Sequence, residues 1–311
     1  MIKVFIDGSA GTTGLRIRER LSGRRDIELL ALSEALRKDV LARKDMLNAA
    51  DIAFLCLPDA AADEAVALIG NPATAVIDTS TAHRTAPGWD YGMPELKGQR
   101  DRIAASKRVA NPGCHASGFI ALIAPLAAAG VLRKDVRLCC TSLTGYSGGG
   151  KKMIAEYEAP DRSPLLGAPR QYGLTQQHKH LKEMAAVCGL IAPPAFMPIV
   201  ADYYSGMEVT VPLFAEDVQG GMEAVRSVYR EVYRGPVIRY AEGAAEGGFL
   251  SASALSGRDD MEITVDGCEA RILLTARFDN LGKGASGAAI QNMNLMIGVS
   301  ETEGLVLKGD E

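Results

Sequence analysis

One cysteine of this chain stands where a nucleophile is expected, directly after a turn and directly before an apolar helix. Cys114 follows Asn111-Pro112-Gly113, a sequence that ends any preceding element. The apolar run over residues 119–126 predicts a buried helix, so the thiol lies at or near a helix N-terminus. The positive end of the helix dipole lowers the pKa of a thiol there and favours the reactive thiolate. A small buried cysteine that begins a helix is the alternative interpretation.

A histidine pair supplies a candidate proton carrier. His178 and His180 are separated by one residue, and in an extended segment residues two apart point to the same face. Both imidazoles would then face one pocket, where either acts as general acid or base beside Cys114, or one of them is structural. Just upstream, Arg170 and Tyr172 would hold a substrate carboxylate or lie on a loop surface. The spacing offers no third ligand, so the sequence predicts no metal site.

The first glycine-rich stretch has the form Gly-x-x-Gly-x-x-Gly over residues 8–14. It follows a strand predicted at 3–6 and precedes a helix predicted at 15–21, which is the context of a dinucleotide-binding loop. Glycine permits a tight turn and the close approach of backbone to a pyrophosphate, while Thr12 and Thr13 would cap the helix and donate hydroxyls. A plain strand–helix turn is the alternative. The candidate cofactor-binding residues of this loop are Gly8, Ser9, Gly11, Thr12, Thr13 and Gly14.

The end of the second predicted strand is where NAD and NADP are distinguished. Glu34 lies roughly 20 residues beyond the glycine loop, where an acid would hold a ribose 2′-hydroxyl. Ser33, Arg37 and Lys38 would instead bind a 2′-phosphate. Two cations and a hydroxyl against one acid favour NADP, with Ser33 and Arg37 as cofactor-binding residues. A solvated helix start is the alternative.

Two further loops carry residues suited to an anionic substrate. Ser80 and Arg84 follow the strand predicted at 75–78, at the carboxyl end where ligands bind in doubly wound sheets. A guanidinium pairs bidentately with phosphate or carboxylate. Ser147 lies in a second glycine loop, 145–151, whose backbone amides would form an anion nest. Exposed surface loops are the alternative in both cases. The candidate substrate-binding residues are Ser80, Arg84, Asn111, Ser147 and Arg170.

An apolar helix predicted over 286–299 carries amide side chains that need partners if they are buried. Gln291, Asn292 and Asn294 would either satisfy backbone groups of the first domain or contact the carboxamide of a nicotinamide. Gly287 and Asn292 are accordingly further candidates for cofactor binding.

The elements that must position these residues change in character along the chain. Strands alternate with helices through the first hundred residues, which predicts an α/β, Rossmann-like, doubly wound parallel sheet. After about residue 130, strands predominate and indicate an α+β domain, with a hairpin turn at Asp266-Gly267. We expect residues 1–112 with 285–311 to form an NADP-binding domain and residues 113–284 an α+β catalytic and oligomerisation domain.

Composition sets limits on the function. The 311 residues are 47% hydrophobic and 23% charged, with a net charge of −4, which is typical of a globular protein and gives no reason to expect nucleic acid or membrane partners. The N-terminal residues lack the regions of a signal peptide. We therefore expect a cytoplasmic protein whose six cysteines are free thiols, and a small molecule as its partner. The apolar strand at 136–143 favours a homodimer or homotetramer.

Taken together, these motifs resemble the N-acetyl-γ-glutamyl-phosphate reductases of arginine biosynthesis, in their shorter form. The resemblance rests on the glycine-rich opening, the Asn-Pro-Gly-Cys run, the Ser-Gly-rich loop after Gly145-Tyr146, the His-x-His pair and the Gly-Lys-Gly-x-x-Gly-x-Ala-x-Gln-Asn-x-Asn run at 282–294. It covers essentially the whole chain. Leu181-Lys182 stands where the longer form frequently has Thr-Pro, and His83 where that form often has Phe.

The resemblance implies a mechanism and leaves three alternatives. Cys114 would attack an acyl phosphate, His180 or His178 would serve as acid and base, and NADPH would reduce the thioester to a semialdehyde. Backbone amides at the helix start would stabilise the oxyanion. An aspartate-semialdehyde-type dehydrogenase and an N-acetylaminoadipyl-phosphate reductase are the nearest alternatives. A non-enzymatic NADP-binding regulator is an alternative of another class.

Overall fold

A computed structural model describes residues 1–309, and within them the chain divides into two compact units. The first unit comprises residues 1–94, 98–112 and 285–305, and the second comprises, of the described residues, 95–97, 113–284 and 306–309. The first contains a parallel sheet and the second a mixed sheet, so the predicted α/β fold with an α+β second part is confirmed.

The sheet of the first unit has the strand order β2-β1-β3-β4-β6-β5, and every pairing in it is parallel. Its central strands are apolar and buried on both faces, as parallel strands between helix layers must be. The order reverses direction between β1 and β3, which places a switch point at their carboxyl ends. The strands are β1 (Ile2–Asp7), β2 (Ile27–Leu30), β3 (Ile52–Leu55), β4 (Ala75–Asp78), β5 (Asp90–Tyr91) and β6 (Arg108–Ala110).

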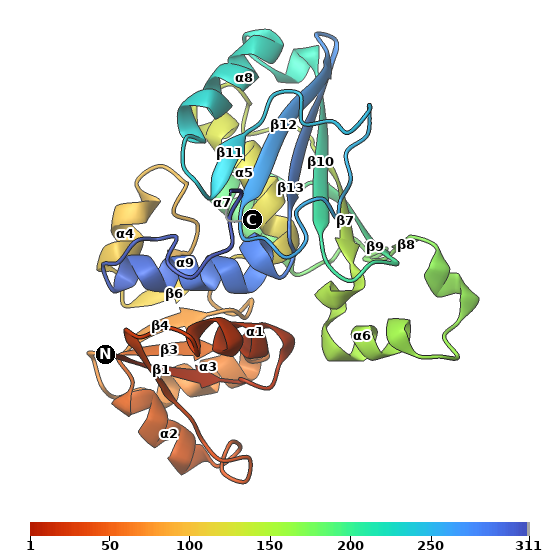
Figure 1. Ribbon diagram of the computed structural model, residues 1–311. Coiled ribbons are helices and arrows are strands. Elements are labelled where there is room, and N and C mark those ends of the chain that lie inside the picture. The colour runs from red at the N-terminus through yellow and green to blue at the C-terminus, as the bar shows by residue number, and fades with distance from the viewer. Residues whose placement is uncertain (310–311) are drawn as a thin grey trace. The chain divides into compact units, whose positions relative to one another are not determined.

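Helices cover both faces of this sheet (Figure 1). Helices α1 and α9 pack against each other on one face, and α2 and α3 pack against each other on the opposite face. Phe5, Leu47, Leu55 and Val76 form part of the core between the sheet and α2. The helices are α1 (Thr12–Leu21), α2 (Val40–Ala49), α3 (Asp59–Leu68), α4 (Gln99–Ala105) and α9 (Gly287–Met296).

The sheet of the second unit is mixed, with the strand order β11-β12-β13-β10-β7-β9-β8. Long antiparallel pairs form its centre, and β7 pairs with β9 in parallel. The strands are β7 (Cys139–Gly145), β8 (Arg170–Gln171), β9 (Ala195–Ala201), β10 (Met207–Phe214), β11 (Ile238–Tyr240), β12 (Met261–Cys268) and β13 (Arg271–Phe278).

Helix α5 (Cys114–Ala128) is the central helix of the second unit and is almost entirely buried. It packs on β10 and β13 and against helices α7 (His180–Cys188) and α8 (Gly221–Val232). Pro125 lies inside α5 and has no backbone N–H to donate to the carbonyl oxygen of Ala121. The buried Tyr233 hydroxyl donates to that carbonyl at 2.5 Å instead, so the proline leaves no unpaired backbone oxygen there.

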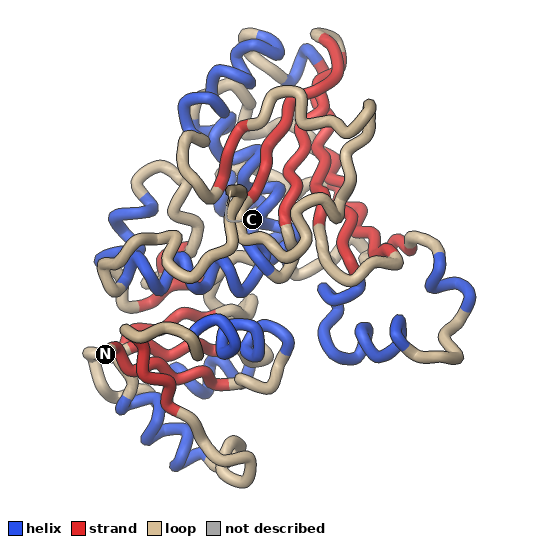
Figure 2. Tube along the Cα trace, in the orientation of Figure 1, coloured by secondary structure: helices blue, strands red, loops and turns tan. Residues whose placement is uncertain are grey.

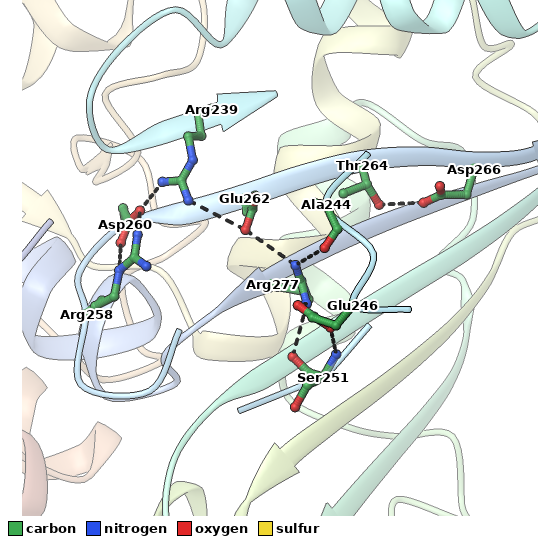
Figure 3. A network of polar contacts seen from close by, with 10 residues as sticks. All are labelled: Arg239, Ala244, Glu246, Ser251, Arg258, Asp260, Glu262, Thr264, Asp266 and Arg277. Carbon is green, nitrogen blue, oxygen red and sulfur yellow. Dashed lines mark hydrogen bonds and ion pairs between the residues drawn. The ribbon is translucent and has the colours of Figure 1, made fainter. Parts of the chain in front are cut away.

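The other face of this sheet carries a network of charged side chains (Figure 3). The guanidinium of Arg277, on β13, lies 2.6 Å from the carboxylate of Glu246 and 3.5 Å from that of Glu262. It also donates to the carbonyl oxygen of Ala244 at 3.1 Å. Arg277 is buried, and Glu246 and Ala244 belong to the loop after β11. The network therefore holds this loop against the sheet.

The structure corrects the prediction of a glycine loop at 145–151. A 3₁₀ turn (Tyr146–Gly149) leads directly into helix α6 (Gly150–Glu158), which Figure 2 shows beyond the edge formed by β7, β9 and β8. Residues 151–158 are good helix formers, so a helix begins as soon as the glycines end.

The predicted hairpin turn at Asp266-Gly267 is also wrong. Both residues belong to β12, where they pair with Leu273 and Ile272, and the connection to β13 is Glu269-Ala270. Gly267 has φ +101°, so the Asp-Gly pair that signals a turn here accommodates a local distortion of the strand. Strand β9 was not predicted, because Pro198 interrupts its pattern.

Candidate functional site

Cys114 is the first residue of α5, at the helix start that the sequence predicts. Gly113 precedes it in extended conformation, and the first turn carries no acidic side chain that would oppose a thiolate. A π-helical turn, Gly282–Ser286, passes the thiol so closely that a Cβ on Gly284 would lie 3.0 Å from the Cβ of Cys114. In the same turn, Lys283 Nζ lies 2.8 Å from the carboxylate of Glu95, and both side chains are buried.

Glu183 links the start of α5 to α7. Its carboxylate is buried, with Oε2 accepting a hydrogen bond from the backbone N–H of Gly113 at 3.3 Å. Its other oxygen, Oε1, lies 3.9 Å from Nε2 of His180. Glu183 lies in the first turn of α7. One buried carboxylate therefore holds the turn before Cys114 and one of the candidate histidines.

The two candidate histidines lie together, but not because their segment is extended. Lys179 has helical backbone angles, and His180 is the first residue of α7, so the predicted extended segment is wrong. The ring centroids of His178 and His180 are 4.7 Å apart, and Nδ1 of His178 accepts from the backbone N–H of His180 at 3.3 Å. The helix turn brings the rings together in place of strand alternation.

His115 joins this pair, and sequence reasoning did not identify it as a site residue. Its ring centroid lies 5.8 Å from that of His178 and 5.6 Å from that of His180. Nδ1 of His115 lies 2.6 Å from the Ser142 hydroxyl, and Nε2 lies 2.7 Å from the Tyr172 hydroxyl. Its place directly after Cys114 was the only signal in the sequence.

Burial keeps two of these imidazoles neutral. Burial, with smaller contributions from His178 and Lys179, lowers the pKa of His115 to about 3. Burial and Lys179 also lower the pKa of His178. The charged form of a buried imidazole is disfavoured because it loses its hydration. Burial therefore disfavours protonation of both rings, and His115 is neutral at neutral pH.

Ser147 and Arg170 are engaged with other residues of the second unit. The buried Ser147 hydroxyl accepts from Nδ2 of Asn280 at 3.0 Å. The guanidinium of Arg170 lies 5.4 Å above the ring of Tyr157 and donates to the hydroxyl of that tyrosine. It also lies 4.0 Å from Glu156. Part of the donor capacity of Arg170 is thus already used.

In the first unit, the glycine loop has the tight geometry that a phosphate-binding turn needs. Gly8 has φ +85°, and a Cβ there would lie 2.2 Å from the carbonyl oxygen of Cys56. A Cβ on Gly14 would lie 2.5 Å from the carbonyl oxygen of Gly8. Gly11 occupies the N-cap position of helix α1, and no side chain caps the helix start, so the expected capping by Thr12 and Thr13 does not occur. The uncapped helix start, without acidic residues, fits an anionic pyrophosphate.

Gly8→Ala is expected to lower the free energy of unfolding by roughly 2–4 kcal/mol, because alanine disfavours positive φ and its methyl group overlaps a carbonyl. Urea denaturation followed by circular dichroism measures this change. Gly23→Ala is the matched control, since a Cβ at Gly23 meets no atom within 4 Å. Equal stability of the two variants would contradict the described geometry of the loop.

The segment after β2 forms an exposed turn. The backbone N–H groups of Leu36 and Arg37 donate to the carbonyl oxygen of Ser33. The guanidinium of Arg37 lies 2.9 Å from the carboxylate of Glu34, and both side chains are exposed. Glu34 was the candidate to hold a ribose hydroxyl, and Arg37 the candidate to hold a 2′-phosphate. The charge of Glu34 is thus partly neutralised by Arg37.

One buried ion pair beside the glycine loop was not predicted. Arg43 of α2 lies 2.9 Å from Asp7, the last residue of β1, and both are buried. A charged pair inside a fold needs close geometry to compensate for desolvation, which the two hydrogen bonds from Arg43 to Asp7 provide. Its sequence signal was weak, because an arginine in a helix is normally a surface residue.

The loop after β4 is organised by the buried Asp78. This carboxylate accepts from the hydroxyl of Ser80 at 2.7 Å and lies 2.6 Å from Nδ1 of His83. Arg84 donates from Nε to the carbonyl of Asn111 at 3.0 Å and from Nη2 to that of Thr79 at 3.1 Å. Arg84 therefore joins the loop after β4 to the segment after β6.

The amides of α9 are engaged within the first unit. Nδ2 of Asn292 donates to the carbonyl of Gly92 at 2.9 Å and lies 3.2 Å from Oδ1 of Asn111. Nδ2 of Asn111 donates to the carbonyl of Ala285 at 3.0 Å. Gly287 is the buried first residue of α9. Asn292 thus satisfies backbone of this unit, the first of its two predicted roles, while its buried Oδ1 accepts no hydrogen bond within residues 1–309.

No cluster of three or more His, Cys, Asp or Glu side chains in residues 1–309 has an arrangement that would hold a metal ion. None of the helices in the same range combines the length and the apolar character needed to cross a membrane.

Two family models match the chain. The model described as semialdehyde dehydrogenase, NAD binding domain, matches residues 3–106. The model described as semialdehyde dehydrogenase, dimerisation domain, matches residues 114–280. The second range begins at Cys114, and the two ranges together cover most of the chain.

Curated relatives and solved structures agree with these models. The N-acetyl-gamma-glutamyl-phosphate reductase of Rhizobium meliloti is 47% identical to this chain, and the match covers 95% of this chain and 98% of that protein. The reductase 2 of Nostoc sp. is 43% identical, and the match covers 97% of this chain and 99% of that protein. Aspartate semialdehyde dehydrogenase II of Vibrio cholerae shares the fold, with a TM-score of 0.72 at 17% identity over 96% of this chain and 98% of that one. The enzyme of Candida albicans, solved with NADP, gives a TM-score of 0.67 at 14% identity over 94% and 98%. The chain therefore belongs to the semialdehyde dehydrogenase fold family and, within it, to the N-acetyl-γ-glutamyl-phosphate reductases.

Proposed function

We propose that this protein reduces N-acetyl-γ-glutamyl phosphate to N-acetyl-L-glutamate 5-semialdehyde and inorganic phosphate, a step of arginine biosynthesis, with NADPH as reductant. The observation that carries the proposal is the position of Cys114 at the start of α5, where Glu183 joins the preceding turn to His180. The names of the curated relatives support the substrate. The shared fold alone would fit an aspartate-semialdehyde-type enzyme equally well.

Cys114 is the proposed nucleophile. Its thiolate attacks the acyl carbonyl, the carbon–sulfur bond forms, and the bond to phosphate breaks, so that a thioester remains on the protein. After reduction of the thioester carbon, the carbon–sulfur bond breaks again and returns the thiolate and the free aldehyde. Backbone N–H groups at the start of α5 are the proposed donors to the oxyanion of both tetrahedral species.

His180 is the proposed acid and base. His180 is buried, but its Nε2 lies 3.9 Å from the carboxylate of Glu183, whose charge offsets part of the cost of a protonated imidazole, whereas burial and Lys179 disfavour the charged form of His178. A protonated His180 can donate to the departing phosphate or to the oxyanion formed on reduction, and Glu183 fixes its ring. His178, with Nδ1 on the backbone of His180, is then a structural neighbour.

The glycine loop and the turn after β2 are the proposed cofactor-binding elements of the first unit. When bound, the reduced nicotinamide supplies the hydride. Gly8, Gly11 and Gly14 permit the backbone approach, and the uncapped start of α1 fits the pyrophosphate. The proposed cofactor-binding residues are Gly8, Ser9, Gly11, Thr12, Thr13, Gly14, Ser33, Arg37, Gly287 and Asn292.

NADP is proposed over NAD because Arg37 lies beside Glu34 and offsets its charge. Arg37→Ala is expected to raise the KM for NADPH about tenfold, because one charge-assisted hydrogen bond to a phosphate is lost. The same variant should change the KM for NADH less than about twofold. Steady-state kinetics with each cofactor measure both values. Arg25→Ala, at the opposite end of β2, is the matched control. Equal effects on the two cofactors would argue against a 2′-phosphate at Arg37.

The roles of the two parts of the chain are proposed as the sequence suggests. Residues 1–112 with 285–311 bind the cofactor, and residues 113–284 carry the nucleophile and the subunit contact of a homodimer or homotetramer. The description of the matching dimerisation-domain model supports the second role. Light scattering coupled to size-exclusion chromatography measures the assembly. The proposed substrate-binding residues are Ser80, Arg84, Asn111, Ser147 and Arg170.

Oxidation of semialdehydes in the presence of phosphate tests the substrate. N-acetylglutamate semialdehyde, aspartate semialdehyde and N-acetylaminoadipate semialdehyde are compared with NADP and with NAD. We expect kcat/KM with NADP to be highest for N-acetylglutamate semialdehyde, by at least about a hundredfold. A higher value for either of the other two would replace the proposed substrate, and binding of NADP without any turnover would support a regulator.

A further inference from the structure

The parallel ladder between β4 and β6 ends just before the turn that leads to Cys114. At its end, the backbone N–H of Asn111 donates to the carbonyl oxygen of Asp78. One further step in this register would bring the N–H of Ser80 to the carbonyl oxygen of Asn111. That N–H donates instead to Oδ1 of Asp78, at 2.9 Å. The ladder therefore leaves the carbonyl oxygen of the buried Asn111 in need of another donor.

Arg84 supplies this donor. Its Nε donates to the carbonyl oxygen of Asn111 at 3.0 Å, and its Nη2 donates to that of Thr79 at 3.1 Å. A guanidinium can hold two carbonyl oxygens at once because its N–H groups are fixed in one plane, which an ammonium group cannot reproduce. The side chain thus takes the place of the next ladder bond and ties the segment after β6 to the segment after β4.

The residue before Arg84 is held at both nitrogens of its ring. Nδ1 of His83 lies 2.6 Å from the carboxylate of Asp78, and Nε2 lies 3.2 Å from that of Asp63, on α3. The ring also stacks on Trp89, with centroids 4.0 Å apart. The side chain of Arg84 therefore extends from a backbone that is fixed to a strand and to a helix of the first unit.

The carbonyl of Asn111 determines how the chain enters the turn before Cys114. It belongs to the planar peptide that joins Asn111 to Pro112, so a hydrogen bond to its oxygen orients that whole peptide. The ring of Pro112 then fixes the next φ at about −65°. Gly113 follows as the N-cap of α5, and its N–H is held by Glu183. Few freely rotating bonds thus separate the peptide that Arg84 holds from the first residue of α5.

We propose that Arg84 is a positioning residue, which holds the turn of residues 111–113 in the conformation that places Cys114 first in α5. The N–H groups of a helix start stabilise a thiolate only when they point toward it, so a loosened turn would favour the protonated thiol. This role is distinct from the substrate contact proposed above for Arg84. The inference rests on the proposed function in one respect, namely that the Cys114 thiolate is the nucleophile.

Alkylation of the thiol in the absence of substrate tests the inference. Wild type, Arg84→Lys and Arg84→Met are treated with iodoacetamide from pH 5 to pH 10, and peptide mass spectrometry follows each cysteine. Both variants are expected to move the half-maximal pH of Cys114 alkylation upward by about one unit, which slows alkylation about tenfold well below the wild-type midpoint. Above both midpoints the rates should be equal. The exposed Cys139 and Cys268 serve as internal references and should keep their profiles.

The two variants and a matched control separate position from charge and from stability. Arg84→Lys keeps the charge and loses the planar fork, so an effect of charge alone would move the profile of Arg84→Met only. Arg108 also donates to two backbone carbonyls, those of Thr74 and Lys107, at the opposite end of the same two strands. Arg108→Lys should therefore leave the Cys114 profile unchanged, even where it lowers the melting temperature as much as Arg84→Lys does.

Steady-state kinetics with the acyl phosphate separate positioning from substrate binding. Loss of position lowers kcat, whereas loss of a substrate contact made equally in the ground and transition states raises KM. Arg84→Lys keeps a cation for the substrate, so we expect it to lower kcat about tenfold and to leave KM within about twofold of wild type.

Two results would overturn the inference. One is a folded Arg84→Lys protein whose Cys114 profile matches that of wild type, whatever its KM. The other is a shift of equal size in Arg108→Lys, which would make the effect one of general stability. If Arg84→Met does not fold, the profile of Arg84→Lys decides alone. Failure of the proposed function is visible separately, as a wild-type protein that does not reduce the acyl phosphate, since alkylation requires no substrate.

Discussion

Cys114→Ser is expected to lower kcat/KM for the acyl phosphate by more than about a thousandfold, because a serine hydroxyl at a helix start remains protonated and cannot attack without a strong base. The only atom exchanged is the sulfur, so binding of NADPH should stay within about twofold of wild type. Both quantities come from one preparation, the first from NADPH consumption and the second from nucleotide fluorescence titration.

Cys139→Ser provides the matched control, since Cys139 is an exposed thiol of the same unit. Its activity should equal that of wild type. Retention of more than about a tenth of the activity in Cys114→Ser would show that the reaction does not pass through this sulfur.

His180→Asn is expected to lower kcat by roughly 10²–10⁴-fold with little change in KM, because proton transfer is removed while the binding groups remain. The variant should also lose the alkaline limb of the profile of kcat against pH, since the group that must be protonated is gone. Steady-state rates with the acyl phosphate from pH 5 to pH 9 measure both effects.

Two neighbours of His180 sharpen this prediction. Glu183→Gln keeps the shape of the side chain and removes its charge, so it should lower kcat less than His180→Asn. It should also shift the alkaline limb to lower pH, because the imidazolium loses its carboxylate. His178→Asn should keep most of the activity. A larger loss in His178→Asn than in His180→Asn would exchange the roles of the two histidines.

The sequence predicted best what depends on local pattern. The start of α5 follows from a turn of Asn, Pro and Gly before an apolar run, and the parallel sheet follows from alternating strands and helices. The glycine spacing of residues 8–14 similarly requires a tight turn, which the positive φ of Gly8 shows. In these cases the residues that determine the structure are neighbours in the chain.

Features that depend on distant residues were missed or misread. His115 joins the candidate site only because β7 and the segment before α7 bring Ser142 and Tyr172 to it. Glu183 gained its role from a backbone amide 70 residues away. The pair of His178 and His180 was predicted correctly as neighbours for the wrong reason, since a helix start and not a strand brings the rings together.

The most direct test of the account is the chemical state of Cys114 after exposure to the acyl phosphate without NADPH. We predict about one equivalent of phosphate released per active chain, together with a mass increase of one N-acetylglutamyl group on the peptide that contains Cys114. Addition of NADPH should then remove the adduct as semialdehyde. Phosphate release that requires NADPH from the start, or an adduct on any other residue, would contradict the thioester mechanism.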